Sequence, residues 1–226
     1  LKLLTAEDAW ELRGDEVQFP VGRPVDLEYA ILGRTLSFLE IGRSPPDQPI
    51  MPVIKSYPRS QAAYDYFLRG LGEYLSDNTS DSIVDLQKAL QMEPAFALAK
   101  VYLGLAFLRD EETGDKIRLE HAERLCLEAR ELDSQLQAAD FCLGETALAA
   151  GNLESARDYY ESALLKGPPD YEILLQLWTV SGRLGQQKAM IPLLETVIAR
   201  KPEFWLGYDF LAHAYRAAGS LESAVM

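Results

Sequence analysis

A six-residue segment occurs twice in this chain, and its spacing constrains the fold more than any other feature. Gly151–Ala156 (GNLESA) returns as Gly219–Ala224 (GSLESA), 68 residues later and with five of six residues identical. Gly185 lies midway, so the underlying step is 34 residues. A fixed period of about 20 to 50 residues is typical of chains built from stacked copies of one supersecondary unit. We therefore expect a repeat architecture.

Other residues follow the same step, and the segments between them read as paired helices. Each unit has an apolar-periodic segment, a short turn with Gly or Asn, a second apolar-periodic segment, and a Pro that ends it. The second unit is longer, since Gly104 and Gly144 are 40 residues apart, and we expect its six additional residues between the two helices. The matching positions are Leu143, Leu177 and Leu211, Pro168 and Pro202, and Gly70 and Gly104.

The spacing of small and large residues resembles the tetratricopeptide-repeat family. Its pattern places Leu-Gly and an aromatic on the first helix, Ala and an aromatic on the second, and Pro after it. The third unit matches best, although Ala147 stands where the first helix usually has its aromatic. The resemblance implies an all-α fold, a right-handed solenoid of helical hairpins with about four and a half repeats. The other residues of the pattern are Leu143, Gly144, Ala156, Tyr160, Ala163 and Pro168.

The chain divides by composition into three parts. Residues 1–43 read as a partial α/β segment, with a hairpin in which Trp10 and Leu12 precede Val17 and Phe19, and a helix from about residue 26 to 41. Residues 44–60 are Pro-rich and read as a stiff linker. The predicted repeat units are 61–96, 97–136, 137–170, 171–204 and a truncated 205–226.

The junction before the first unit suggests a context. The front segment followed by Ala63–Gly70 (AYDYFLRG) resembles the junction in large bacterial signalling proteins between a domain similar to the amino-terminal domain of TolB and tetratricopeptide repeats. Such proteins also carry a Ser/Thr kinase, an adenylate cyclase or a winged-helix regulator. The resemblance implies a cytoplasmic or extracytoplasmic part of a bacterial signalling protein. Because the first residue is Leu1 and no signal-peptide core follows, we expect a piece of a larger chain.

Charge excludes several classes of partner. The chain carries 22 Lys and Arg against 35 Asp and Glu, a net charge of −13. Binding to nucleic acid or to an anionic membrane is therefore electrostatically unfavourable. Apolar stretches such as Val101–Leu108 are shorter than the roughly 18 residues that cross a bilayer. We expect a protein or peptide partner, no nucleic acid and no membrane insertion.

The residue types that carry catalysis are sparse. His121 and His213, the two histidines, form no metal-ligand spacing. Gly70-Leu71-Gly72 lacks the third glycine of a dinucleotide-binding loop. We expect no catalysis, no cofactor and no metal. Cys126 and Cys142 lie in helical segments and are expected to be buried free thiols.

With no catalytic or metal site expected, the candidate functional site is a binding surface. In stacked helical hairpins the first helices line the concave face, so their free side chains point into a groove. Arg183 and Arg216 are candidates for binding an acidic group. The alternative for Phe67, Leu71 and Tyr74 is that residues 1–60 fold back and cover them. The predicted groove residues are Phe67, Leu71, Tyr74, Leu105, Arg109, Phe141, Glu145, Thr179, Arg183, His213 and Arg216.

The functional expectation is a non-catalytic protein–protein interaction or scaffold module, as the sensory or regulatory part of a bacterial signalling protein. One alternative is the regulatory region of an enzyme, a Ser/Thr kinase or adenylate cyclase, whose catalytic domain lies outside this chain. Another is a peptide or small-ligand sensor that uses the groove. The truncated fifth unit, 205–226, should also leave an apolar edge through which the chain could self-associate.

Overall fold

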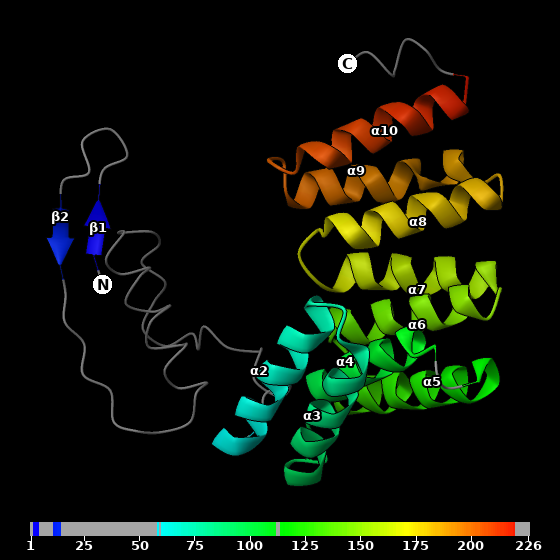
Figure 1. Ribbon diagram of the computed structural model, residues 1–226. Helices are drawn as coiled ribbons and strands as arrows, with labels where there is room; N and C mark the ends of the chain where they lie inside the picture. Colours follow the sequence, from blue (N-terminus) through cyan, green and yellow to red (C-terminus); the bar gives the residue numbers. More distant parts are fainter. Residues whose placement is uncertain (1, 5–10, 15–57, 59, 112–113, 220–226) are drawn as a thin grey trace.

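Helices follow one another in a stack along the chain. The computed structural model describes residues 2–4, 11–14, 58, 60–111 and 114–219. Figure 1 shows α4 to α10 succeeding one another from one end of the molecule to the other. The helices are α2 (Gln61–Leu75), α3 (Thr79–Met92), α4 (Ala97–Arg109), α5 (Asp115–Leu132), α6 (Gln137–Ala149), α7 (Leu153–Lys166), α8 (Tyr171–Arg183), the short 3-10 helix η2 (Gln187–Met190) leading into α9 (Ile191–Arg200), and α10 (Trp205–Ala217).

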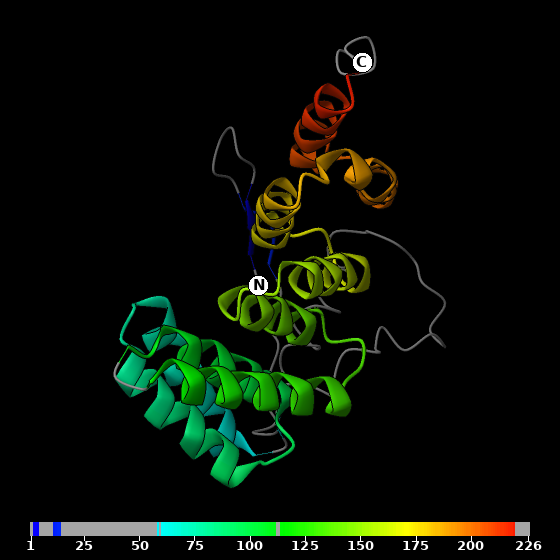
Figure 2. The ribbon, with the colours of Figure 1, turned by 90° about the vertical axis from the view of Figure 1, so that its right-hand side faces the viewer.

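Consecutive helices pack as antiparallel pairs, and each pair packs on the next. The pairs are α2 with α3, α4 with α5, α6 with α7, and α8 with the short η2 that leads into α9, while α10 packs on α9 and η2. When the molecule is turned by 90°, α6, α7 and α8 are seen nearly along their axes, whereas α5 runs across the view (Figure 2). The stack therefore twists along its length, as the predicted helical-hairpin solenoid requires. The fold class expected from the sequence is confirmed.

The recurring GNLESA-type segment is a helix stop followed by a helix start. Gly151 has a φ of +78°, and Gly185, at the midpoint of the step, has +67°. A residue without a Cβ adopts this left-handed conformation at little energetic cost, which is why glycine commonly ends helices. The Asn152 side chain then accepts a hydrogen bond from the Ser155 amide at 3.2 Å and caps α7. The repeat observed in the sequence is thus a repeated turn.

Small residues on the first helices allow the second helices to approach closely. A Cβ on Gly144 would overlap the ring of Tyr160, and one on Gly70 would lie 2.7 Å from Cγ of Leu86. Leu86 and Tyr160 are fully buried beneath these glycines. The first and third hairpins therefore depend on the absence of a side chain at one position and on a large side chain opposite it.

The amino-terminal strands form a pairing that the sequence did not predict. Strand β1 (Lys2–Leu4) pairs antiparallel with β2 (Glu11–Gly14), with Leu3 opposite Arg13. The sequence predicts that a strand near residues 10–13 pairs with one at residues 17–19, and that pairing stays a prediction because residues 17–19 lie outside the described residues. The sequence pattern did not predict β1, which has only three residues, too few for an alternating pattern to reveal it. Residues 15–57, which include the expected second strand, the helix from 26 to 41 and most of the linker, lie outside the described residues.

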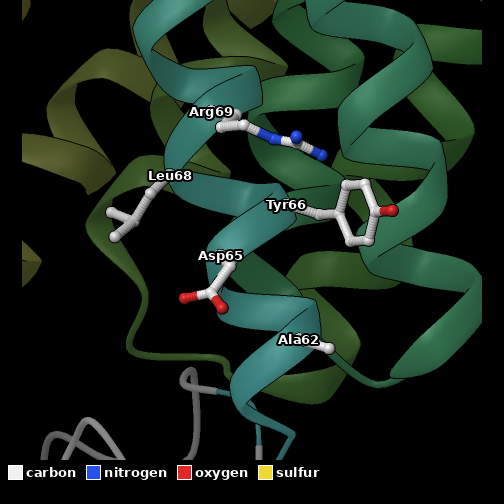
Figure 3. A pocket seen from close by; sticks show the side chains of 5 residues that line it. All are labelled: Ala62, Asp65, Tyr66, Leu68 and Arg69. Atoms are coloured by element: carbon white, nitrogen blue, oxygen red, sulfur yellow. The ribbon is translucent and has the colours of Figure 1, made fainter.

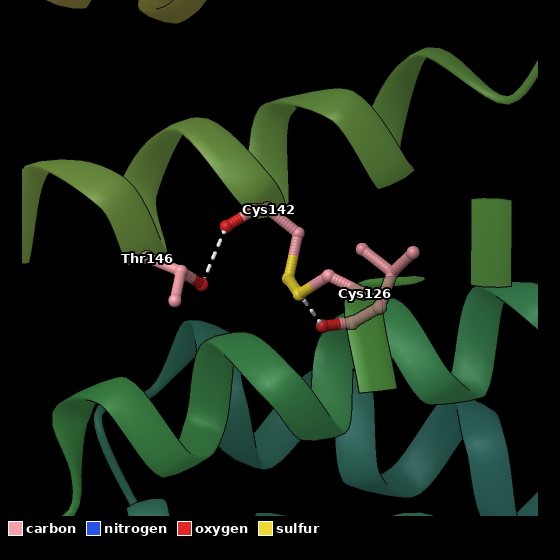
Figure 4. Close-up of a disulfide and its surroundings, with 4 residues drawn as sticks. Cys126, Cys142 and Thr146 are labelled. Carbon is pink, nitrogen blue, oxygen red and sulfur yellow. Dashed lines mark hydrogen bonds between the residues drawn. A yellow bond between two sulfur atoms is a disulfide. The ribbon is translucent and has the colours of Figure 1, made fainter. Parts of the chain in front are cut away.

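The expectation of free thiols is wrong. Cys126 on α5 and Cys142 on α6 are both fully buried, as predicted, but they form a disulfide (Figure 4). Their Cα atoms are 5.8 Å apart, which lies within the range that a disulfide spans. The two cysteines occupy facing positions where α5 and α6 come close, a relationship that the sequence pattern of each helix separately does not reveal.

Candidate functional site

Two of the predicted site residues meet at the amino-terminal end of the first-helix face, by which we mean the solvent-facing side of α2, α4, α6, α8 and α10. The guanidinium of Arg109 on α4 lies 3.9 Å from the centre of the Tyr74 ring on α2. It also donates hydrogen bonds to the carbonyl oxygen of Tyr74 at 3.1 Å and to Asp77 at 3.3 Å. The Tyr102 ring lies edge-on to that of Tyr74, with the ring centres 5.7 Å apart. The first and second hairpins are therefore joined here by aromatic and cation–π contacts.

A second cluster is built on α6. The hydroxyl of Tyr160 donates a hydrogen bond to Oε1 of Glu145 at 2.7 Å, and the Phe141 ring lies 6.0 Å from the Tyr160 ring. Burial raises the pKa of Glu145, and the negative charge of Glu172 on α8 raises it further. The hydrogen bond from Tyr160 acts in the opposite direction and lowers that pKa. Burial also raises the pKa of Tyr160, and Glu145 adds to this effect. Glu145 is thus a half-buried acceptor that is easier to protonate than an ordinary glutamate.

Electrostatic interactions connect the two clusters. Burial raises the pKa of Tyr74, and the negative charges of Glu172 and Glu145 raise it further. The positive charge of Arg109 lowers that pKa. Burial raises the pKa of Tyr102 too, again with Glu172 contributing. The charges of Glu145 on α6 and Glu172 on α8 thus act on side chains of α2 and α4. We call the partly or fully exposed side chains that these four first helices contribute the tyrosine–carboxylate face: Tyr74, Tyr102, Arg109, Phe141, Glu145 and Glu172.

Two predicted groove residues are instead part of the core. Phe67 is 4% exposed, and its ring lies 4.8 Å from that of Phe96. Leu105 is 6% exposed and packs with Val101 and other residues of α4, α5 and α6. A large apolar side chain gains more from contact with the next hairpin than from exposure to water. Leu71, on the same helix as Phe67, is half-buried and packs against the same cluster.

The carboxy-terminal half of the predicted groove is polar, and some of its side chains pair with neighbouring polar groups. His213 on α10 lies between Asp209, at 3.7 Å, and Arg216, whose Nη2 is 3.1 Å from Nδ1 of the imidazole. The Thr179 hydroxyl donates to the carbonyl oxygen of Leu175 at 2.9 Å. Arg183 is exposed, and no hydrogen bond or ion pair joins it to another residue in the described part of the chain. Arg183 is therefore a freer cation than Arg216.

Sequence reasoning missed two members of the tyrosine–carboxylate face, Tyr102 and Glu172. Both lie on first helices, each beside a residue that the structure buries, Val101 and Ile173 respectively. The signal that could have found them is residue type, because a tyrosine and a glutamate tolerate partial exposure better than the neighbouring Val101 and Ile173.

Other candidate sites in the structure are weak. A shallow depression on α2 is lined by Ala62, Asp65, Tyr66, Leu68 and Arg69 (Figure 3). The guanidinium there is engaged, since Arg69 lies 4.5 Å from the centre of the Tyr66 ring and 3.3 Å from Asp85.

The described residues bring together no group of three or more His, Cys, Asp or Glu side chains suited to a metal ion. Among the helices described, none combines the length and the apolar character that a membrane span needs.

Comparisons with known proteins give relatives in sequence and in fold. No family model matches the chain. Tetratricopeptide repeat protein 37 of Xenopus laevis is 30% identical over 141 residues, which cover 61% of this chain and 9% of that protein. This chain therefore corresponds to a small part of that relative's length.

Solved structures are similar in fold at low sequence identity. The structure of Naa15/Naa10 bound to HypK-THB matches with a TM-score of 0.58 and 18% identity, over 72% of this chain and 24% of that one. The pilF protein of Pseudomonas aeruginosa matches with a TM-score of 0.56 and 19% identity, over 72% of each chain. These matches show that the chain has the fold of a helical-hairpin solenoid, and its relative in sequence is a tetratricopeptide repeat protein.

Proposed function

We propose that this chain is a non-catalytic protein–protein interaction module that binds a segment of its partner on the first-helix face. The observation that carries this proposal is the tyrosine–carboxylate face, to which four helices from four different hairpins each contribute partly exposed side chains. A surface assembled from several repeats suits an extended polypeptide, because successive residues of that polypeptide can meet successive helices. A protein of the same fold, Naa15/Naa10, is recorded bound to HypK-THB, which supports the proposal by analogy.

The chemistry of the face favours a basic partner segment. Two carboxylates, Glu145 and Glu172, lie among tyrosine rings in a chain of net charge −13. Lysine and arginine side chains bind both to carboxylates and to aromatic faces. The contact of Arg109 with Tyr74 is an example of this pairing within the chain. We therefore expect a partner segment with Lys or Arg beside an apolar residue.

The wider context of the module is a further part of the proposal. The Ala63–Gly70 junction supports a sensory or regulatory role in a bacterial signalling protein. The alternative is regulation of a kinase or cyclase domain carried elsewhere in the same polypeptide. The two differ in whether a catalytic domain flanks these residues, so sequencing the parent gene on both sides separates them. A peptide or small-ligand sensor would use the same face.

Self-association is a second candidate, favoured by α10. Trp205 is 69% exposed and Tyr208 49% exposed on this helix, which is unusual for large aromatic side chains. Sedimentation equilibrium tests this candidate directly. A dimer that dissociates in a Trp205→Ser, Tyr208→Ser variant would support it, and a monomer at all concentrations would exclude it.

Selection from a random peptide library displayed on phage tests the main proposal. Peptides enriched on the unaltered chain should contain Lys or Arg and should lose binding to a Tyr74→Ala, Glu145→Lys variant. A Glu123→Lys variant, altered on the exposed side of the second helix α5, is the matched control and should keep binding. Enriched peptides that bind all three proteins equally would place recognition away from the first-helix face.

A further inference from the structure

The disulfide joins two different hairpins. Cys126 is on α5, the second helix of one hairpin, and Cys142 is on α6, the first helix of the next. The chain contains two cysteines in all, so every other junction between hairpins is held by packing and polar contacts alone. A solenoid has no single core, and its shape is the sum of the angles at these junctions. A covalent bond at one junction therefore restricts the shape of the whole solenoid.

The surroundings of the two sulfur atoms hold a glycine and a hydrogen-bond acceptor. A Cβ on Gly104 of α4 would lie 3.0 Å from the Cys126 sulfur and 3.1 Å from the Cys142 sulfur, so the glycine provides the space they occupy. The Cys142 sulfur is 3.6 Å from the carbonyl oxygen of Val101. A thiol at this position can donate a weak hydrogen bond to that oxygen, whereas a disulfide sulfur cannot. The reduced Cys142 would therefore have a hydrogen-bond partner in the interior.

The bond lies directly behind the proposed binding face. Cys142 is one residue after Phe141 and three before Glu145 on the same helix. The hydroxyl of Thr146 donates to the carbonyl oxygen of Cys142 at 2.8 Å within this helix (Figure 4). Since α6 packs on both α4 and α5, the link to Cys126 limits how α6 can move relative to Tyr102 and Arg109.

Reagents cannot reach the sulfur atoms in the folded chain. Cys126 and Cys142 are both 0% exposed. Thiol–disulfide exchange needs direct attack by a thiolate on a sulfur atom. The bond can therefore form or break only while the α5–α6 junction is open, during folding or in a local opening event.

We propose that the Cys126–Cys142 bond is a redox-dependent lock that holds the α5–α6 junction, and with it the position of α6 on the first-helix face. In the oxidation, both thiols lose their protons and together give up two electrons to a disulfide-bearing co-reactant, such as glutathione disulfide. That co-reactant takes up two protons and two electrons and leaves as two thiols. The lock operates where such an oxidant is present while the chain folds. Its effect on partner binding rests on the function proposed above, but the lock itself does not.

Thiol counting tests whether the lock forms. The whole chain is refolded in glutathione disulfide with a smaller amount of glutathione, denatured, alkylated with iodoacetamide and weighed by mass spectrometry. The proposal predicts that neither cysteine is alkylated, and that dithiothreitol opens the bond many times faster in urea than in buffer. Two alkylated cysteines after oxidative refolding would overturn it, as would equally fast reduction with and without urea.

Hydrogen exchange tests what the lock does. The oxidised chain is compared with a chain refolded and kept in a phosphine reductant. Reduction should speed exchange several-fold at the end of α5 and along α6, leave α8 to α10 unchanged, and lower Tm by about 4 °C or more. A Cys126→Ala, Cys142→Ala variant should show no response to the reductant. Identical exchange in both states, or a change spread evenly to α10, would overturn the proposal. Because neither measurement needs a partner, its failure is distinct from a failure of the proposed function.

Discussion

The hydroxyl of Tyr160 and the carboxylate of Glu145 form a 2.7 Å hydrogen bond that joins the second helix of the third hairpin to the exposed side of its first helix. Tyr160 is fully buried and its ring packs against Phe141. One residue thus fills the interior of the hairpin and orients a carboxylate at its surface. The stability of this hairpin and the chemistry of its face are consequently linked.

Removing that hydroxyl should destabilise the fold. Tyr160→Phe keeps the ring but leaves a half-buried carboxylate without its donor, for an expected loss of about 1–2 kcal/mol in the free energy of unfolding. Tyr215→Phe is the matched control, because Tyr215 donates to Glu195 at 2.9 Å in an exposed pair and should change little. Urea denaturation followed by circular dichroism measures both. Equal effects in the two variants would show that burial does not strengthen the Tyr160 bond.

Glu145 should make stability depend on pH. Its pKa in the folded chain is raised by burial above the ordinary 4.5, so the folded protein holds this proton more tightly than the unfolded chain does. The resulting stability is present below pH 4.5 and is lost as the pH rises through the raised folded pKa. Glu145→Gln removes this titration. The unaltered chain should therefore lose stability relative to the variant as the pH rises above 4.5 and through the raised folded pKa. A difference in urea midpoint that stays constant as the pH rises would contradict this.

The close contact at Gly144 predicts opposite effects for two glycine substitutions. In Gly144→Ala the new Cβ would lie 2.6 Å from Cδ1 of Tyr160, so the second helix must move, at a cost of about 1–3 kcal/mol. Gly72 is an exposed helical glycine with open space around it. Gly72→Ala should stabilise the chain by about 0.5–1 kcal/mol, because alanine loses less backbone entropy in a helix. Thermal melting of the two variants should shift in opposite directions.

Arg200 should stabilise the junction between the third and fourth hairpins. Its guanidinium donates to the carbonyl oxygens of Leu164 at 3.1 Å, Leu165 at 3.0 Å and Gly167 at 2.7 Å, at the carboxyl end of α7. Arg200→Ala removes these bonds and a cation from the negative end of the helix dipole, for an expected loss of about 1–2 kcal/mol. Arg183→Ala is the control, since Arg183 is exposed and should change the urea midpoint little. Comparable losses in both would remove the capping explanation.

The sequence predicted the hairpin fold because the features that specify it are local. The positive-φ glycine at 151 returns 34 residues later as Gly185, and the Asn152 cap and the contact of Gly144 with Tyr160 each lie within one unit. Each can be recognised without knowing how two hairpins are arranged relative to each other. The same holds for the burial of Cys126 and Cys142 taken singly.

What the sequence did not predict depends on the angle between hairpins. One step along a helix turns a side chain by about 100°, so a small change in that angle decides whether Val101 or Tyr102 meets the solvent. This is why Phe67 and Leu105 were assigned to the groove, whereas Tyr102 and Glu172 were missed. The disulfide was missed for the same reason, because the sequence of neither helix determines the distance between α5 and α6.

A calorimetric titration shows whether the first-helix face binds the partner. The best peptide from the library selection is titrated into the unaltered chain and into the Glu145→Lys and Glu123→Lys variants. We expect Glu145→Lys to weaken binding by at least about tenfold, because a half-buried carboxylate is replaced by a cation that faces a basic peptide, and Glu123→Lys to stay within about twofold. Equal affinity for all three proteins, or an equal loss in both variants, would contradict this expectation.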